Sequence, residues 1–204
     1  MNIQAIFFDI DGTLQTTDLN PTVPDSTRLA LKKLREKGIK LFIATGRPIS
    51  LTTDFQKLID FEFDGWVTTN GQYCFTEGKV IRESTLDTDE ILEMFKLLKQ
   101  KKIVGVIQHQ SKGYQNYTDD FFNFPIETII DDNNQGHVFD DSPICQVMVK
   151  LDEKEVETEK EIFKIVKNGK ATRWTHIYFD LIPLDGGKNR GIDAMLDYYH
   201  IPLE

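Results

Sequence analysis

The stretch that decides the fold is Ile3-Gln4-Ala5-Ile6-Phe7-Phe8-Asp9-Ile10-Asp11-Gly12-Thr13. Its first part is a short apolar run, which predicts a buried strand that ends at Phe8 and leads into a turn. The carboxylates of Asp9 and Asp11 then emerge at the C-terminal end of that strand. Together with the permissive backbone of Gly12, they form an oxygen-rich corner that suits a hard cation such as Mg²⁺.

The next two segments predict a helix and a second strand. Asp25-Ser26 offers a helix cap, and Gly38 ends the helix before the apolar strand Ile39 to Ala44. A strand-helix-strand crossover is almost always right-handed and makes the two strands parallel. Asp9 and Thr45 are therefore expected at the same edge of the sheet, where open α/β sheets bind their ligands.

The rest of the chain predicts a second domain inserted into the first. After the turn at Asn70-Gly71, the pattern changes from about Tyr73 to hairpins and helices that are typical of an α+β unit. Within it, the loop around Asp131 to Gln135 is expected to be mobile surface. The predicted fold class is α/β, with a Rossmann-like parallel-sheet core at residues 1–79 and 184–204 and an inserted α+β domain at residues 80–183.

Composition and charge narrow the function. The net charge of −9 over 204 residues disfavours binding to nucleic acid and to anionic membranes, so an anionic substrate needs a local positive site. Cys74 and Cys145 form neither a CxxC unit nor a disulfide framework, which favours a reducing cytoplasm. The N-terminal run is too short for a membrane span and lacks a basic start, so we expect no signal peptide.

The paired aspartates suggest phosphoryl chemistry. The first carboxylate can attack phosphorus to give an aspartyl phosphate, and the second can protonate the leaving oxygen and later deprotonate water. The alternative is an Asx-type turn in which Asp9 and Asp11 only cap backbone groups. The full string after a buried strand favours the catalytic interpretation.

The string Phe8-Asp9-Ile10-Asp11-Gly12-Thr13-Leu14 resembles motif one of the haloacid dehalogenase superfamily. Ala44-Thr45-Gly46-Arg47 resembles motif two, where a hydroxyl and a backbone amide bind phosphate. Lys188 resembles the motif-three lysine, which neutralises the nucleophile and the phosphate. The resemblance implies Asp9 as nucleophile, Asp11 as acid and base, and Thr45 and Lys188 as phosphate ligands, with Mg²⁺ on Asp9 and Asp11.

The order of the pieces resembles the Cof-type branch of that superfamily, because the inserted unit lies between motifs two and three. In that branch an α/β cap selects small phosphorylated metabolites, often sugar phosphates. Asn70-Gly71 resembles the Asn-Gly turn of the branch, although the dipeptide by itself is more often an ordinary turn. The expected substrate-binding set is Gly12, Thr45, Gly46, Arg47, Asn70 and Lys188; for Arg47 the alternative is a solvated side chain.

One motif of the family is missing from this sequence. The family has a further core strand and an acidic Gly-Asp-Gly-x-Asn-Asp motif after the lysine helix, whereas the sequence stops at Glu204. We expect weakened activity, self-association through an unpaired sheet edge, or both. Two other functions stay open: a catalytically impaired phosphate-binding or regulatory fragment, and a phosphomutase that transfers the phosphoryl group to a second hydroxyl.

Overall fold

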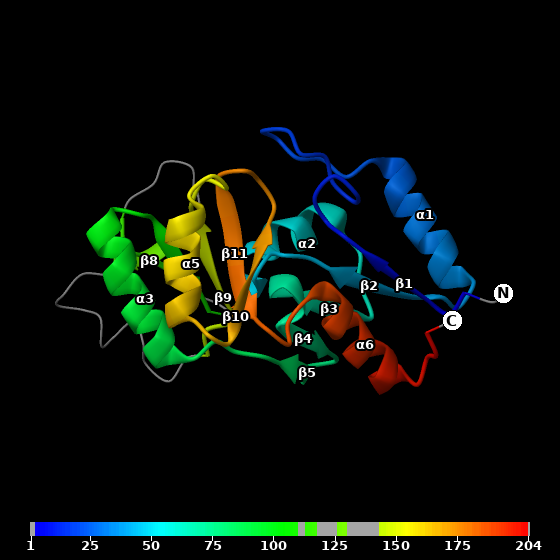
Figure 1. Ribbon diagram of the computed structural model, residues 1–204. Helices are drawn as coiled ribbons and strands as arrows, with labels where there is room; N and C mark the ends of the chain where they lie inside the picture. The colour runs from blue at the N-terminus through cyan, green and yellow to red at the C-terminus, as the bar shows by residue number, and fades with distance from the viewer. Residues whose placement is uncertain (1–2, 110–112, 118–125, 130–142, 204) are drawn as a thin grey trace. The chain divides into compact units, whose positions relative to one another are not determined.

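The computed structural model describes residues 3–109, 113–117, 126–129 and 143–203 (Figure 1). The chain divides into two compact units, residues 1–83 with 186–204 and residues 84–185. The domain boundaries predicted from the sequence lie at 79/80 and 183/184. The difference at the first division arises because the strand over residues 79–83 pairs within the sheet of the first unit. The loop predicted around residues 131–135 lies outside the described residues.

The first unit contains a five-stranded sheet in the order β1-β2-β3-β4-β5. Its first three strands are parallel, and its last two are antiparallel. The strands are β1 (Ala5–Phe8), β2 (Lys40–Ala44), β3 (Gly65–Thr68), β4 (Tyr73–Thr76) and β5 (Lys79–Glu83). The fold class is thus the α/β class predicted from the sequence. The hairpin at which the sequence pattern changes, from about Tyr73, extends this sheet, and the predicted division at 79/80 falls inside it.

Helices cover both faces of that sheet. Successive side chains of β2 point to opposite faces of the sheet, so the strand contributes to two hydrophobic clusters. Ile43 packs in a cluster with Leu31 and Phe55, whereas Phe42 packs on the other face with Met195. The first cluster contains residues of α1 and α2, and the second contains residues of α6. The bounds are α1 (Asp25–Glu36), α2 (Thr53–Ile59) and α6 (Lys188–Tyr199), with 3-10 turns η1 (Ile49–Leu51) and η2 (Thr69–Gly71).

The second unit is built on a six-stranded sheet in the order β10-β11-β9-β6-β7-β8. All its pairs are antiparallel except β7-β8. Helices α3 (Thr88–Lys101) and α5 (Val156–Ile165) pack into one core with the sheet. The strands are β6 (Gly105–Gln108), β7 (Gly113–Gln115), β8 (Ile126–Ile129), β9 (Gln146–Lys150), β10 (Gly169–Arg173) and β11 (Tyr178–Pro183).

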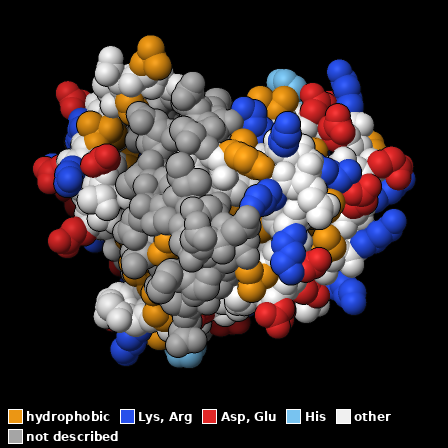
Figure 2. Space-filling view, turned by 90° about the vertical axis from the view of Figure 1, so that its left-hand side faces the viewer, with side chains coloured by type: hydrophobic (Ala, Val, Ile, Leu, Met, Phe, Trp, Pro, Cys, Tyr) orange, Lys and Arg blue, Asp and Glu red, His pale blue; other side chains and the backbone are white. Residues whose placement is uncertain are grey.

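The surface carries side chains of both charges. On the face shown in Figure 2, Lys and Arg side chains are interspersed with Asp and Glu among the described residues. Within the described ranges, no helix combines the length and the apolar character that crossing a membrane requires.

Candidate active site

Three parallel strands end at one edge of the first sheet, and the candidate residues follow them directly. Asp9 comes after β1, Thr45 comes after β2, and the turn η2 comes after β3. Because parallel strands present their carboxyl ends at the same edge, these segments meet there. The sheet therefore gathers side chains that are far apart in the sequence.

The loop after β1 is anchored by Ile10. The Ile10 side chain is completely buried, and its carbonyl oxygen accepts the N–H groups of Thr13, Leu14 and Gln15 at 3.3, 3.0 and 3.1 Å. Gly12 takes the left-handed backbone (φ +71°) that closes this tight turn. With Ile10 held inward, the side chains of Asp9 and Asp11 on either side of it stay partly exposed, at 43% and 45%.

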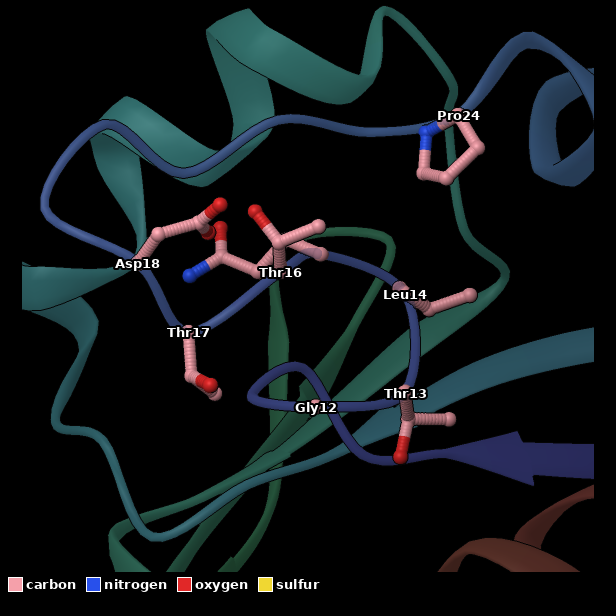
Figure 3. Close-up of a pocket in the computed structure, with 8 residues that line it drawn as sticks. Gly12, Thr13, Leu14, Thr16, Thr17, Asp18 and Pro24 are labelled. Atoms are coloured by element: carbon pink, nitrogen blue, oxygen red, sulfur yellow. The ribbon is translucent and has the colours of Figure 1, made fainter.

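The loop continues past Gln15 around an open depression (Figure 3). Figure 3 shows the chain folding back so that Thr17 lies beside Gly12; a Cβ added to Gly12 would meet the Thr17 methyl group at 3.7 Å. The depression is lined by Gly12, Thr13, Leu14, Gln15, Thr16, Thr17, Asp18 and Pro24. Its lining therefore includes the hydroxyl-bearing residues Thr13, Thr16 and Thr17 and the exposed residue Asp18.

Each of the two aspartates has its own cation. Lys188 Nζ lies 3.2 Å from Asp9 Oδ1. Arg47 donates from Nε to Asp11 Oδ2 at 2.9 Å and from Nη2 to Asp11 Oδ1 at 2.5 Å. Gln15 Nε2 is the third donor to this carboxylate and the second to Oδ1, at 3.1 Å. Each carboxylate is thus balanced by one cation, so the site does not add to the net charge of −9.

Thr45 and Gly46 present two donors at this edge. The Thr45 hydroxyl oxygen accepts the backbone N–H of Arg47 at 3.1 Å, so its own proton is available to a ligand. The backbone N–H of Thr45 is already used, because it donates to Val67 at 2.8 Å. The N–H of Gly46 has no acceptor among the described residues. The amide predicted to bind phosphate is therefore that of Gly46.

The turn η2 has an unusual backbone. Thr69, Asn70 and Gly71 all have positive φ, at +52°, +54° and +88°. Thr69 N–H donates to the Arg47 carbonyl at 2.9 Å, and Asn70 N–H donates to the Thr45 carbonyl at 3.1 Å. Since left-handed non-glycine residues are strained, surrounding contacts must hold them. The turn thereby holds the loop of Thr45 to Arg47 in place through two backbone hydrogen bonds.

Two further contacts complete the turn. The fully buried Gln72 donates from Nε2 to the carbonyls of Thr69 and Asn70 at 2.8 and 3.0 Å. Gly71 packs against the backbone of Gly187, since an added Cβ would lie 2.1 Å from its carbonyl oxygen. Lys188 follows as the first residue of α6, where its cation opposes the helix dipole and finds Asp9 as its partner.

The structure thus brings together Asp9, Asp11, Thr45, Gly46, Arg47 and Lys188, with Asn70 in the supporting turn. Gly12 contributes its backbone to the loop. Sequence reasoning missed the two glutamines, Gln15 and Gln72, because a single glutamine in a loop carries no spacing signal. It also missed the contact of Arg47 with Asp11.

The donor set can be tested for a metal ion. In the described part of the chain, no group of three or more His, Cys, Asp or Glu residues could hold one. Mg²⁺ does not require such a group, because proteins often bind it through one or two carboxylates, waters and substrate phosphate. The Asp9 carboxylate and the Asp11 main-chain carbonyl, which accepts no hydrogen bond from a described residue, fit that requirement.

The fold and the site together define a class, the α/β enzymes that act on phosphate esters at the carboxyl edge of a parallel sheet. Residues 6–204 match the family model of the haloacid dehalogenase-like hydrolases. The chain therefore belongs to this family of hydrolases.

Individual relatives agree with this assignment. The Bacillus subtilis (strain 168) protein named "Putative phosphatase YkrA" is 25% identical, over 97% of this chain and 75% of the relative. A Haemophilus influenzae protein named "Putative phosphatase" is 28% identical over 54% of this chain and 40% of its own length. The structure of the HAD subclass IIB sugar phosphatase BT4131 superposes with a TM-score of 0.83 at 28% identity, covering 98% of this chain and 77% of that one.

Proposed function

We propose that this hydrolase is a magnesium-dependent phosphatase of the Cof-type branch, which hydrolyses small phosphorylated metabolites, sugar phosphates above all, through a phospho-aspartate on Asp9. The observation that carries the proposal is the Asp9 carboxylate held 3.2 Å from Lys188, at the sheet edge where Thr45 and Gly46 offer donors that no described residue occupies. The substrate class is supported by the similarity to BT4131, a sugar phosphatase.

The proposed reaction has two displacements. An Asp9 carboxylate oxygen attacks phosphorus, the new oxygen-phosphorus bond forms as the ester bond breaks, and Asp11 donates a proton to the leaving alkoxide. Asp11 then takes a proton from a water molecule, which attacks the aspartyl phosphate. The bond to Asp9 breaks, phosphate leaves, and the nucleophile is restored. Lys188, the Thr45 hydroxyl and the Gly46 amide hold the phosphoryl oxygens during both steps.

In this proposal the Asp9 carboxylate and the Asp11 main-chain carbonyl hold Mg²⁺. When bound, the ion supplies positive charge that screens the nucleophile from the phosphate and stabilises the charge of the transition state. Asp9 must be ionised both to bind the ion and to attack.

The test is phosphate release from a panel of phosphorylated metabolites by the purified chain, with Mg²⁺ and with a chelator. We expect metal-dependent release that is lost in Asp9→Asn and retained in Asp18→Asn, a matched change at an exposed aspartate of the same loop. Turnover that survives Asp9→Asn would refute the phospho-aspartate.

Two other outcomes identify the alternatives. Binding of inorganic phosphate without turnover would favour a phosphate-binding or regulatory role. Formation of an isomeric sugar phosphate, seen by product analysis, would identify a phosphomutase.

A further inference from the structure

The Asp11 carboxylate accepts three hydrogen bonds from side chains, although the residue is half-exposed. Both of its oxygens accept from Arg47, and Oδ1 also accepts from Gln15. Gln15 is only 5% exposed, so its amide has little freedom to move. A carboxylate held at both oxygens has one orientation of its plane, whereas a free aspartate rotates about its terminal bond.

Arg47 is itself fixed by its surroundings. Its Nη1 donates to the Leu51 carbonyl at 3.1 Å, and its backbone carbonyl accepts from Thr69 at 2.9 Å. Three of the five guanidinium N–H groups are therefore used within the protein. The loop that carries Thr45 thus also fixes the fork that holds Asp11.

We infer that Arg47 is a positioning residue for Asp11, with Gln15 as its second support, and that it is not a substrate ligand. The inference rests on the proposed function, in which Asp11 exchanges protons with the leaving group and with water. A general acid or base must lie within hydrogen-bond reach of the reacting oxygen, so its orientation limits the chemical step. The planar guanidinium fork provides this two-point contact, which a lysine ammonium cannot reproduce.

The kinetic test compares Arg47→Gln and Arg47→Lys with the wild type. We expect kcat to fall by about 10- to 100-fold in both variants while KM stays within about twofold, because substrate contacts are unchanged. The loss should be larger for an alkyl phosphate than for p-nitrophenyl phosphate, whose leaving group needs little protonation. The control is Arg190→Gln, an exposed arginine of the same unit, which should retain wild-type kinetics.

A double mutant separates positioning from substrate binding. If Arg47 acts through Asp11, adding Arg47→Gln to Asp11→Asn should change kcat by less than about twofold. A raised KM that persists in the Asp11→Asn background would instead show a substrate ligand and overturn the inference. Equal losses with both leaving groups would overturn it too.

A measurement without turnover keeps the inference distinct from the proposed function. In the metal-free protein, the ¹H–¹⁵N signal of Arg47 Nε should exchange slowly with water and shift in Asp11→Asn, whereas the Arg190 signal should not change. If the signal of Arg47 is indifferent to Asp11→Asn, the inference fails, whatever the chain hydrolyses. An absence of wild-type turnover, with the shift present, would count against the proposed function alone.

Discussion

Gly71 approaches Gly187 so closely that adding one methyl group at Gly71 should measurably lower the free energy of unfolding. In Gly71→Ala the new Cβ would lie 2.1 Å from the Gly187 carbonyl oxygen and 3.1 Å from Lys188 Cα. Ordinary carbon-oxygen contacts are near 3.3 Å, so the Gly187 carbonyl would have to move by about 1 Å. Because Lys188 is the next residue, that movement displaces the lysine from Asp9.

The size of the effect follows from two terms. An alanine at φ +88° costs about 1–2 kcal/mol for its left-handed backbone. The overlap with a buried backbone adds about 1–3 kcal/mol, as for overpacked cores. Gly38 provides the matched control, since it has φ +76° but no atom within 4 Å of an added Cβ. Gly38→Ala should therefore show the first term without the second.

The assay is urea unfolding followed by the fluorescence of Trp66, a buried residue of β3, in a Trp174→Phe background that removes the tryptophan of the second unit. We expect Gly71→Ala to lower the free energy of unfolding of the first unit by about 2–5 kcal/mol and to lower kcat. If Gly71→Ala and Gly38→Ala are equally destabilising, the backbone contact does not constrain the Lys188 segment, and the reasoning is refuted.

Two further predictions concern groups outside the catalytic set. Burial raises the pKa of the Cys74 thiol from 9.0 to about 12, although the Arg82 guanidinium lowers it in part. Because the thiol pKa is higher in the folded state, the stability that the protonated thiol contributes is complete below pH 9 and is lost as the pH rises toward 12. In urea titrations, the free energy of unfolding should therefore fall less steeply with rising pH in Cys74→Ala than in the wild type. An equal fall in both proteins would contradict this. The Asp64 carboxylate accepts the Leu41 N–H at 2.8 Å and pairs with Arg35 at 3.1 Å. Asp64→Ala should therefore cost about 1–3 kcal/mol and Asp64→Asn about 0–1 kcal/mol, and an equal cost for both would show that the buried N–H does not need its acceptor.

The core strands could be predicted because of where they lie. A parallel strand covered on both faces is a continuous apolar run, and β2 fits that pattern closely. The run at β1 also forms a strand, but its residues are only partly buried, because β1 stands at the end of the strand order. The predicted strand Ile39 to Ala44 differs from β2 by one terminal residue. The crossover rule then gave the parallel pairing and the shared edge without further information.

The β4-β5 hairpin shows where local pattern fails. Alternating residues and a turn predict two paired strands, but they do not say which sheet the pair joins. In the structure β4 lies antiparallel to β3, and Phe75 is directly opposite Trp66 with their rings stacked at 6.3 Å. That choice depends on side chains that meet only after folding, so the boundary predicted at 79/80 cut through the hairpin.

Some features of the candidate site could be predicted from the sequence, and others could not. The placement of Asp9 and Thr45 follows from strand ends, and that of Lys188 follows from a motif resemblance. The contact between Arg47 and Asp11 depends on two side-chain conformations, which spacing cannot specify. The roles of Gln15 and Gln72 depend on the backbone groups left unpaired by a tight loop and by a left-handed turn.

Two glycines allow the segments of the site to approach closely. Gly46 lies against the Asn70 side chain, and Gly71 lies against the backbone of Gly187 and Lys188, so the loops after β2 and β3 and the start of α6 approach more closely than larger residues would allow. Short backbone contacts cannot bend as long side chains do, and donors fixed in this way need no reorganisation when charge develops on a phosphoryl group. The strained residues Thr69 and Asn70 are the cost of that rigidity, offset in part by the two hydrogen bonds from Gln72. In the proposed function, phosphate binding by a chain of net charge −9 therefore depends on a few donors held firmly at one sheet edge.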